Sequence, residues 1–596
     1  MFDIVKSCLY LFSILFLTLS IFWVKKNDRK LNAVSYFLIS VWTVMCYQLS
    51  VAVLVDTLHI GVSIVSVGIM NYALALGCTF YTIYKRERQK YEIHIFDILV
   101  LLVLAGIAVF WGGSQFGWKF DCFNYQSSVD CSRHLMFARE VAVKHELTFN
   151  MPFMAVNTGL FFEAMYAFIV PYKDIHLILM TDVIMLFFAG AMFWTLVRYK
   201  LNTKLLLVMG GAASVFYMMG YPLNNMVFGT SYLGAGMTLS VVIFSLISRY
   251  ESGEIKKYYF GITLVVALYS LLKTYNLFFP IVLISVIVYF GVKNIPRRFE
   301  KTLKFVPYIL TGLFLACQIA ICIIFRFFYT KIPPLSVLGE WGYMYCSLFG
   351  DFVFLFPFIL YRIVNCYKTK KWSFDFIMGM FMIAYIGAFL YACYLGKVSP
   401  YYYYKNYYLF WAIAFYMMIE VVCSCSKERL EFIVTYCIGI FGLWLFVFTG
   451  IEAAFEEKSE INGQTLNYEL NGRSLFRLYS WNFERAKEEA IPIPMNDDLE
   501  SFYYKVADIT LAEGEQIKCL NSIYYGYYEY FALGYQWEDP DKSLSTQDAL
   551  NQAVDQYKYA CVIYYNCYDL MPETAEQLKN YEVVFENNAG CIYRLN

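Results

Sequence analysis

The sequence predicts a mainly α-helical membrane protein, with about 14 transmembrane helices in a polytopic bundle and a C-terminal extracytoplasmic α/β domain. Hydrophobic residues make up 60% of the chain, charged residues only 16%, and the mean hydropathy is +0.50. Soluble globular proteins are nearer half apolar and a quarter charged. The apolar excess lies in long uncharged runs of about 20 residues, the length that spans a bilayer. Backbone polar groups in hydrocarbon must be paired within the segment, so we expect these runs to be helices.

The apolar runs divide the chain into three parts. Residues 1–94 form an N-terminal group of transmembrane helices, residues 95–450 a transmembrane core with a large outer loop at 113–174, and residues 451–596 the extracytoplasmic domain. The first run has no small-residue cleavage site before its flanking lysines, so we expect it to remain as a span. The expected spans are 5–24, 34–57, 61–84, 95–112, 175–197, 204–222, 229–248, 258–273, 277–292, 303–327, 350–367, 374–396, 406–424 and 431–450.

Basic residues gather in alternate connections between these runs, and the positive-inside rule places such connections in the cytoplasm. All of them agree with one topology, in which the N-terminus lies outside the plasma membrane. The segments 113–174, 328–349, 397–405 and 451–596 then also lie outside. The basic connections hold Lys25, Lys26, Arg29 and Lys30; Lys85, Arg86, Arg88 and Lys90; Arg198, Lys200 and Lys204; Arg249, Lys256 and Lys257; Lys293, Arg297, Arg298 and Lys301; Arg362, Lys368, Lys370 and Lys371; and Lys427 and Arg429.

The C-terminal tail has the patterning of a small α/β domain. We expect Ser545 or Thr546 to cap its helix and a hairpin to turn at residues 587–590. The tail contains no nucleotide-binding glycine fingerprint, and the chain contains no CxxC pair that would indicate a structural zinc site. Strands are expected at 516–522, 559–565, 581–585 and 591–595, a helix at 545–556, and a helix or loop at 523–534.

The outer loop holds the first group of candidate functional residues. From Arg133 onward its residues have helical spacing, and Asp130 shares one helix face with Arg133 and His134. A carboxylate at the start of such a helix, at the membrane surface, can act as a general base toward an acceptor hydroxyl. The alternative, which the spacing alone favours, is that Asp130 caps the helix. Asp121, the second carboxylate, either meets a metal or substrate or is simply solvated.

Four further residues are candidates because they are charged and lie in or beside apolar runs. Asp182 lies inside an expected span, where a carboxylate is costly and indicates either a functional role or pairing with a polar neighbour. Lys273, Lys405 and Arg326 lie near the outer ends of spans, where a cation can hold a lipid phosphate. The alternative for these cations is an anchor that reaches the headgroups. Lys273 also ends the first of two short runs, which form either a tight hairpin or two broken half-helices.

The run DCSRHLMFAREV at 130–141, followed by His145-Glu146-Leu147 and Pro152, resembles the first large outer loop of GT-C glycosyltransferases. The lipid A aminoarabinose transferases and the protein mannosyltransferases carry a similar acidic residue followed by Ala-Arg-Glu. The stretch from Lys405 to Tyr408 is similar to a late Arg-Tyr element of such transferases. The resemblance covers this loop closely and the layout of the chain loosely.

The resemblance implies a sugar donor linked to polyprenyl phosphate, with Asp130 as the catalytic base. The chain departs from the family in three ways: Cys131 stands where a Glu is frequent, the loop follows the fourth expected span and not the first, and the family's Lys-Pro-Pro is missing. These departures bear on the identity of donor and acceptor more than on the fold.

We therefore expect an inverting membrane glycosyltransferase whose acceptor is a glycan, lipid or protein of the cell envelope. Arg133, His134, Lys273, Lys405 and Arg326 would bind substrate or its phosphate. The sequence leaves open whether the reaction requires a divalent metal. The equal numbers of acidic and basic residues give no indication of nucleic-acid binding. Two alternatives are a transporter or flippase for lipid-linked sugars and a non-catalytic assembly protein for cell-surface polymers.

Overall fold

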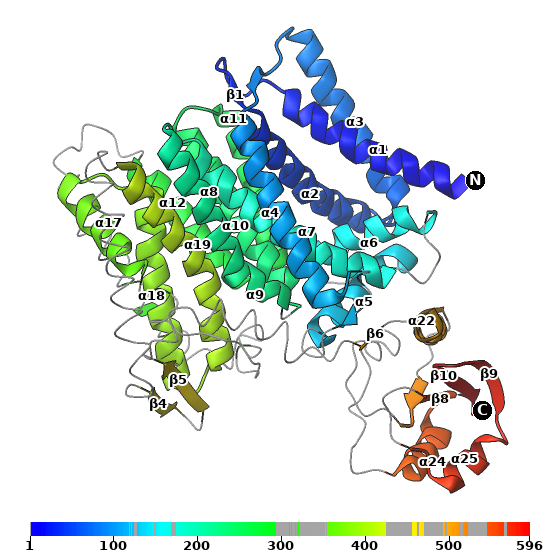
Figure 1. Ribbon diagram of the computed structural model, residues 1–596. Helices are drawn as coiled ribbons and strands as arrows, with labels where there is room; N and C mark the ends of the chain where they lie inside the picture. Colours follow the sequence, from blue (N-terminus) through cyan, green and yellow to red (C-terminus); the bar gives the residue numbers. More distant parts are fainter. Residues whose placement is uncertain are drawn as a thin grey trace.

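The computed structural model describes residues 2–118, 128–147, 151–168, 174–227, 229–293, 354–424, 497–512, 545–564 and 569–595, with short pieces between them. The described chain is mainly helical, which confirms the predicted class (Figure 1). Each helix keeps its backbone hydrogen bonds inside its own segment, as the apolar composition requires.

Within the described residues, nine helices are long and apolar enough to cross a membrane. The expected spans 303–327 and 431–450 fall almost entirely outside the described residues. The described helices are compatible with a multi-pass membrane protein, and they do not fix the total number of spans. The nine are α1 (Phe2–Trp23), α2 (Ala33–Thr57), α3 (Ile64–Tyr84), α4 (Ile95–Phe116), α7 (Asp174–Arg198), α8 with α9 (Lys204–Met219 and Tyr221–Val227), α10 (Ser231–Glu251), α18 (Phe374–Tyr394) and α19 (Pro400–Ser424).

Three shorter helices also coincide with expected spans: α11 (Lys257–Thr274), α12 (Phe279–Lys293) and α17 (Phe356–Thr369). α11 follows directly after α10, and Lys293 at the end of α12 binds Glu251 at the end of α10, with 2.9 Å between Nζ and Oε1. α12 therefore returns to the end of the bundle from which α11 departs. Of the two predicted alternatives, this pair is a helical hairpin.

The connections rich in basic residues meet at one end of the bundle, which we call the basic end. The backbone N–H of Lys256 donates to the carbonyl of Lys26 at 3.1 Å, and Arg198 binds Asp97 at 2.5 Å. β1 (Leu31–Asn32) pairs in parallel with β2 (Tyr91–Glu92) there. The gathering of these connections agrees with the single topology predicted from the distribution of Lys and Arg.

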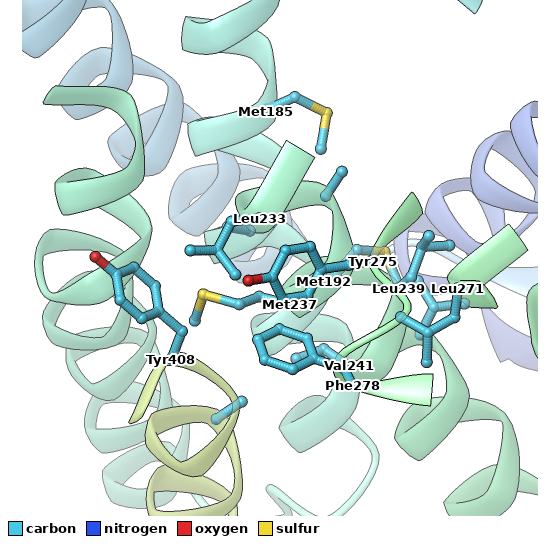
Figure 2. Close-up of a cluster of buried hydrophobic side chains, with 14 of the residues drawn as sticks. Met185, Met192, Leu233, Met237, Leu239, Val241, Leu271, Tyr275, Phe278 and Tyr408 are labelled. Carbon is cyan, nitrogen blue, oxygen red and sulfur yellow. The ribbon is translucent and has the colours of Figure 1, made fainter. Parts of the chain in front are cut away.

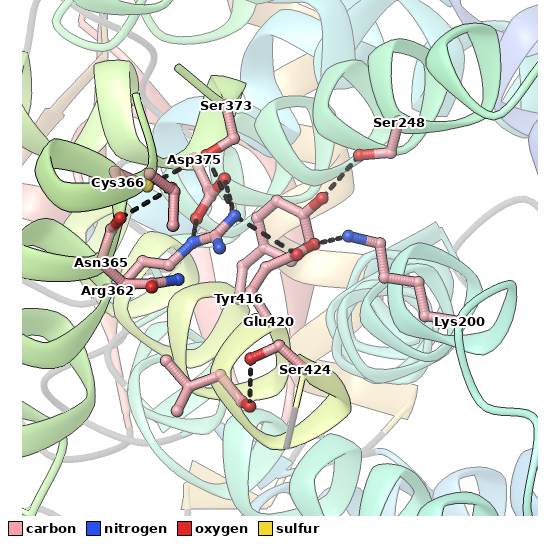
Figure 3. Close-up of polar contacts among 12 residues, drawn as sticks. Lys200, Ser248, Arg362, Asn365, Cys366, Ser373, Asp375, Tyr416, Glu420 and Ser424 are labelled. Atoms are coloured by element: carbon pink, nitrogen blue, oxygen red, sulfur yellow. Dashed lines mark hydrogen bonds and ion pairs between the residues drawn. The ribbon is translucent and has the colours of Figure 1, made fainter. Parts of the chain in front are cut away.

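A buried network of charges ties four segments together at the basic end (Figure 3). Arg362 of α17 makes a two-point contact with Asp375 of α18, at 2.7 and 3.0 Å, and also reaches Glu420 of α19 at 3.4 Å. Glu420 in turn binds Lys200, which follows α7. The Asp375 side chain is only 2% exposed, so its charge depends on Arg362 for stabilisation.

The opposite end, which we call the loop end, is built by the outer loop and the tail. Helices α5 (Ser128–Lys144) and α6 (Phe153–Tyr166) pack closely, since a Cβ on Gly159 would lie 2.3 Å from the carbonyl oxygen of Ala138. β3 (Cys122–Phe123) pairs antiparallel with β6 (Ile493–Pro494) of the tail. The loop and the tail therefore lie at the same end, as the predicted topology requires.

The tail contains a four-stranded sheet with the order β7-β8-β10-β9, which confirms the expected strands. Ser545 caps its helix by accepting the N–H of Asp548 at 3.1 Å, and the expected hairpin joins the last two strands. Two helices of this region, α22 and α25, were not predicted. The elements are β4 (Glu456–Ile461), β5 (Gln464–Glu469), α22 (Asp497–Ala512), β7 (Ile517–Cys519), α24 (Thr546–Gln556), β8 (Tyr559–Ile563), α25 (Pro572–Leu578), β9 (Glu582–Asn587) and β10 (Gly590–Arg594).

Removing one carboxylate from the buried network should destabilise the helical bundle. Asp375→Asn leaves the Arg362 guanidinium without its two-point partner, and we expect a loss of about 3 kcal/mol in unfolding free energy. The measurement is the thermal unfolding midpoint of the purified protein in detergent. Glu576→Gln is the control, because its pair with Lys579 is exposed on both sides and contributes little. Equal midpoints for the two variants would contradict a stabilising role for the network.

Candidate functional site

The site at the loop end is centred on the Lys405 ammonium. Lys405 is only 3% exposed, and its Nζ lies 3.9 Å from the ring centroid of Tyr401 and 5.0 Å from that of Tyr402. The rings of Tyr232 and Tyr275 lie at 5.6 and 6.0 Å, and Nζ donates a hydrogen bond to the Tyr232 hydroxyl at 3.3 Å. We call these four residues the tyrosine cage. Their ring faces stabilise a cation that has been removed from water.

The cage corrects two expectations for the segment 397–405. This segment was expected to be an outer loop, but α19 begins at Pro400, a residue whose fixed φ suits the first turn of a helix. Tyr403 and Tyr404 in this first turn are 1% and 9% exposed, so the start of the helix packs inside the bundle. The alternative of Lys405 as a headgroup anchor is also wrong, because its ammonium is enclosed by protein.

Helix α5 brings the outer-loop candidates to the cage. The ring of His134 lies 4.6 Å from that of Tyr232, centroid to centroid. Arg133 and Asp130 precede His134 by one residue and by about one helical turn. α5 begins at Ser128, so Asp130 stands in the first helical turn, and its backbone is not at the capping position just before the helix. The side chains of Asp130 and Arg133 lie outside the described residues.

The turn between α11 and α12 supplies Tyr275 to the cage. Tyr275 is 7% exposed, and burial holds the pKa of its hydroxyl well above the usual range, so the phenol stays protonated beside Lys405. Lys273 lies two residues earlier, half-buried in the last turn of α11. Figure 2 shows Tyr275 within a layer of apolar side chains from several helices. This layer includes Met192, Leu233, Met237, Leu239, Val241, Leu271 and Phe278.

A break between α8 and α9 adds buried polar groups next to the start of α19. Gly220 separates the two helices. The ring of Trp411 packs against it so closely that a Cβ on Gly220 would lie 2.4 Å from the ring. Asn224 of α9 is fully buried and accepts a hydrogen bond from the Tyr408 hydroxyl at 2.5 Å. The Gly-Tyr-Pro sequence inside an apolar run is the signal that could have predicted this break.

Of the other predicted site residues, one is buried within α7 and two lie outside the described residues. Asp121 and Arg326 are among the residues that the structure does not describe. Asp182 is 2% exposed within α7, so its carboxyl group is buried in the helical bundle. Within the described residues, no group of three or more His, Cys, Asp or Glu side chains could hold a metal ion. The cage residues Tyr232 and Tyr275 were missed by sequence reasoning.

In comparisons with known proteins, no family model, no curated protein and no solved structure matches this chain. The functional argument therefore rests on the residues of the site.

The close approach of α10 to Tyr275 gives a test of the cage geometry. A Cβ on Gly236 would lie 2.6 Å from the Tyr275 Cβ, which is rigidly attached to the backbone. Gly236→Ala should therefore displace Tyr275 and cost about 1–3 kcal/mol in unfolding free energy. Gly261→Ala on α11 is the control, since a Cβ there meets nothing within 4 Å. The thermal unfolding midpoints of both variants are measured in detergent. An unchanged midpoint for Gly236→Ala would show that α10 does not lie so close to Tyr275.

Proposed function

We propose that this protein is a membrane glycosyltransferase that moves a sugar from a polyprenyl-phosphate-linked donor to an extracytoplasmic acceptor. One observation carries the proposal: helix α5, with Asp130 in its first turn, contacts the cage that encloses Lys405. A carboxylate-bearing turn and a buried cation thus meet at one end of the bundle. Transfer from a phosphate-linked donor requires both a base for the acceptor and positive charge for the leaving phosphate.

In the proposed reaction, the Asp130 carboxylate takes the proton of an acceptor hydroxyl as its oxygen attacks the anomeric carbon. The bond between that carbon and the phosphate oxygen breaks, and polyprenyl phosphate leaves with the bonding electron pair. Attack opposite the leaving group inverts the anomeric carbon. The Lys405 ammonium offsets the charge that develops on the phosphate, in a site with little water to screen it. Lys273 and Arg326 are the further candidates for the same phosphate.

The distribution of charge supports an extracytoplasmic site in the plasma membrane. Lys and Arg of the predicted cytoplasmic connections gather at the basic end, so the loop end with the cage would face outward. The tail joins the same end through β3 and β6 and would lie on the side of the acceptor. The flippase and assembly-protein alternatives make no demand on the basicity of Asp130, so the carboxylate separates them from the transferase.

Asp130→Asn should abolish most of the transfer. The amide cannot accept the acceptor proton, and general-base catalysis typically contributes about 10²–10⁴-fold. The measurement is release of polyprenyl phosphate by the purified protein in nanodiscs, across a panel of polyprenyl-phosphate sugars with candidate acceptors. Glu146→Gln is the matched control, because it makes the same change in the same loop at an exposed position. Wild-type turnover by Asp130→Asn would sink the assignment of the base.

Lys405→Met should separate catalysis from stability. Methionine keeps an unbranched apolar chain in the tyrosine cage, and replacing a buried charge with an apolar group is often neutral or stabilising. We therefore expect an unchanged or higher thermal midpoint, together with a fall of about 10²–10³-fold in kcat because the charge on the leaving phosphate is no longer offset. A stable variant with normal kcat would remove Lys405 from the mechanism.

A further inference from the structure

Within the described parts of the tail and the outer loop, two contacts join them, one at a strand pair just before α5 and one on α5 itself. The first is the antiparallel pair in which Cys122 lies opposite Pro494 and Phe123 opposite Ile493. β3 ends shortly before α5 begins, and β6 ends shortly before α22 begins. The strand pair therefore fixes the starts of the two helices relative to each other. Figure 1 shows α5, β6 and α22 as neighbours at the loop end.

The second contact is an ion pair between these two helices. Arg139 of α5 donates from Nη2 to Oδ1 of Asp508 on α22 at 2.8 Å. The Arg139 side chain is only 10% exposed, whereas that of Asp508 is 53% exposed. A guanidinium held this deep gains more from a carboxylate partner than a pair that is exposed on both sides.

α22 is itself firmly attached to the C-terminal sheet. The Asn587 side chain donates to the carbonyl of Asp498 at 2.6 Å and to the Ser501 hydroxyl at 3.1 Å. The Phe502 ring packs so closely on β10 that a Cβ on Gly590 would lie 2.7 Å from it. Asp508 is therefore attached to the C-terminal sheet through α22, and its position depends on that of the sheet.

α5 contacts the tyrosine cage and the C-terminal domain through different sides of the helix. His134 contacts Tyr232 of the cage, and Arg139 comes five residues later, about 140° around a helix with 3.6 residues per turn. α5 is thus held between the transmembrane bundle and the C-terminal domain. A helix of 17 residues depends on such tertiary contacts for a fixed position.

We propose that the C-terminal domain positions α5 over the tyrosine cage through this two-point clamp, with Arg139 and Asp508 as positioning residues for the Asp130 turn. The inference rests on the proposed transferase function. The domain then sets the distance between the base and the cation through the position of α5. Loosening the clamp lets α5 move away from Tyr232 and lowers the fraction of molecules with an assembled site.

The test compares Asp508→Asn, which removes the charge, with Asp508→Glu, which keeps it, in the full-length protein in nanodiscs. Asp508 is half-exposed, so neither substitution should prevent folding. Hydrogen exchange of the α5 amides is the first readout, and kcat with a polyprenyl-phosphate sugar is the second. We expect Asp508→Asn to speed exchange about threefold to tenfold and to lower kcat about tenfold, while Asp508→Glu stays near wild type on both. Lys144→Gln, which breaks a surface pair with Glu140 on the same helix, is the control and should change neither.

Unchanged α5 exchange in Asp508→Asn would overturn the clamp. Faster exchange with an unchanged kcat would overturn its positioning role. If the wild-type protein transfers none of the sugars offered, the transferase proposal fails by itself, and the exchange comparison still decides whether the domain holds α5.

Discussion

The burial of the Lys405 ammonium among tyrosine rings is the interaction on which the rest of the site depends. Removing a cation from water is costly, so the surrounding groups must hold it in a fixed place. The tyrosine cage does this with side chains from α10, the α11–α12 turn and α19. His134 then extends the same contact to α5. Four parts of the chain therefore meet around one buried charge at the loop end.

The two ends of the bundle use buried charge in different ways. At the basic end, Arg362 and Asp375 neutralise one another in a two-point contact that joins α17 to α18. The opposite charges of such a pair largely cancel, so the pair holds the two helices together and attracts a charged ligand only weakly. At the loop end, the Lys405 ammonium lies against ring faces and donates a hydrogen bond to the Tyr232 hydroxyl. The proposed chemistry belongs to the loop end because helix α5 contacts the tyrosine cage there.

The sequence predicted the helices because apolar length is a local property. The distribution of Lys and Arg predicted that the basic connections share one side, and several of them meet at one end of the bundle. The spacing after Arg133 predicted a helix, which the structure contains. The start of α19 was missed because a Tyr run beside a span is typical of the membrane surface, and only its partners reveal that it is buried. Tyr232 and Tyr275 could not be chosen among 54 tyrosines, because their contacts with Lys405 join distant parts of the chain. α22 was missed because its apolar residues alternate with acidic and other polar ones, and the face that packs on the sheet is revealed only by its partners in β9 and β10.

The central claim is that a lipid-linked sugar binds between α5 and the start of α19. The most direct measurement is photoaffinity labelling with a polyprenyl-phosphate sugar that carries a diazirine on the sugar, followed by peptide mapping. The account predicts labelled peptides from residues 128–144 and 400–412, with the label lost when unlabelled donor is added in excess. Labelling confined to α1, α3 and α4, whose surfaces are largely exposed, or labelling that unlabelled donor does not reduce, would contradict it.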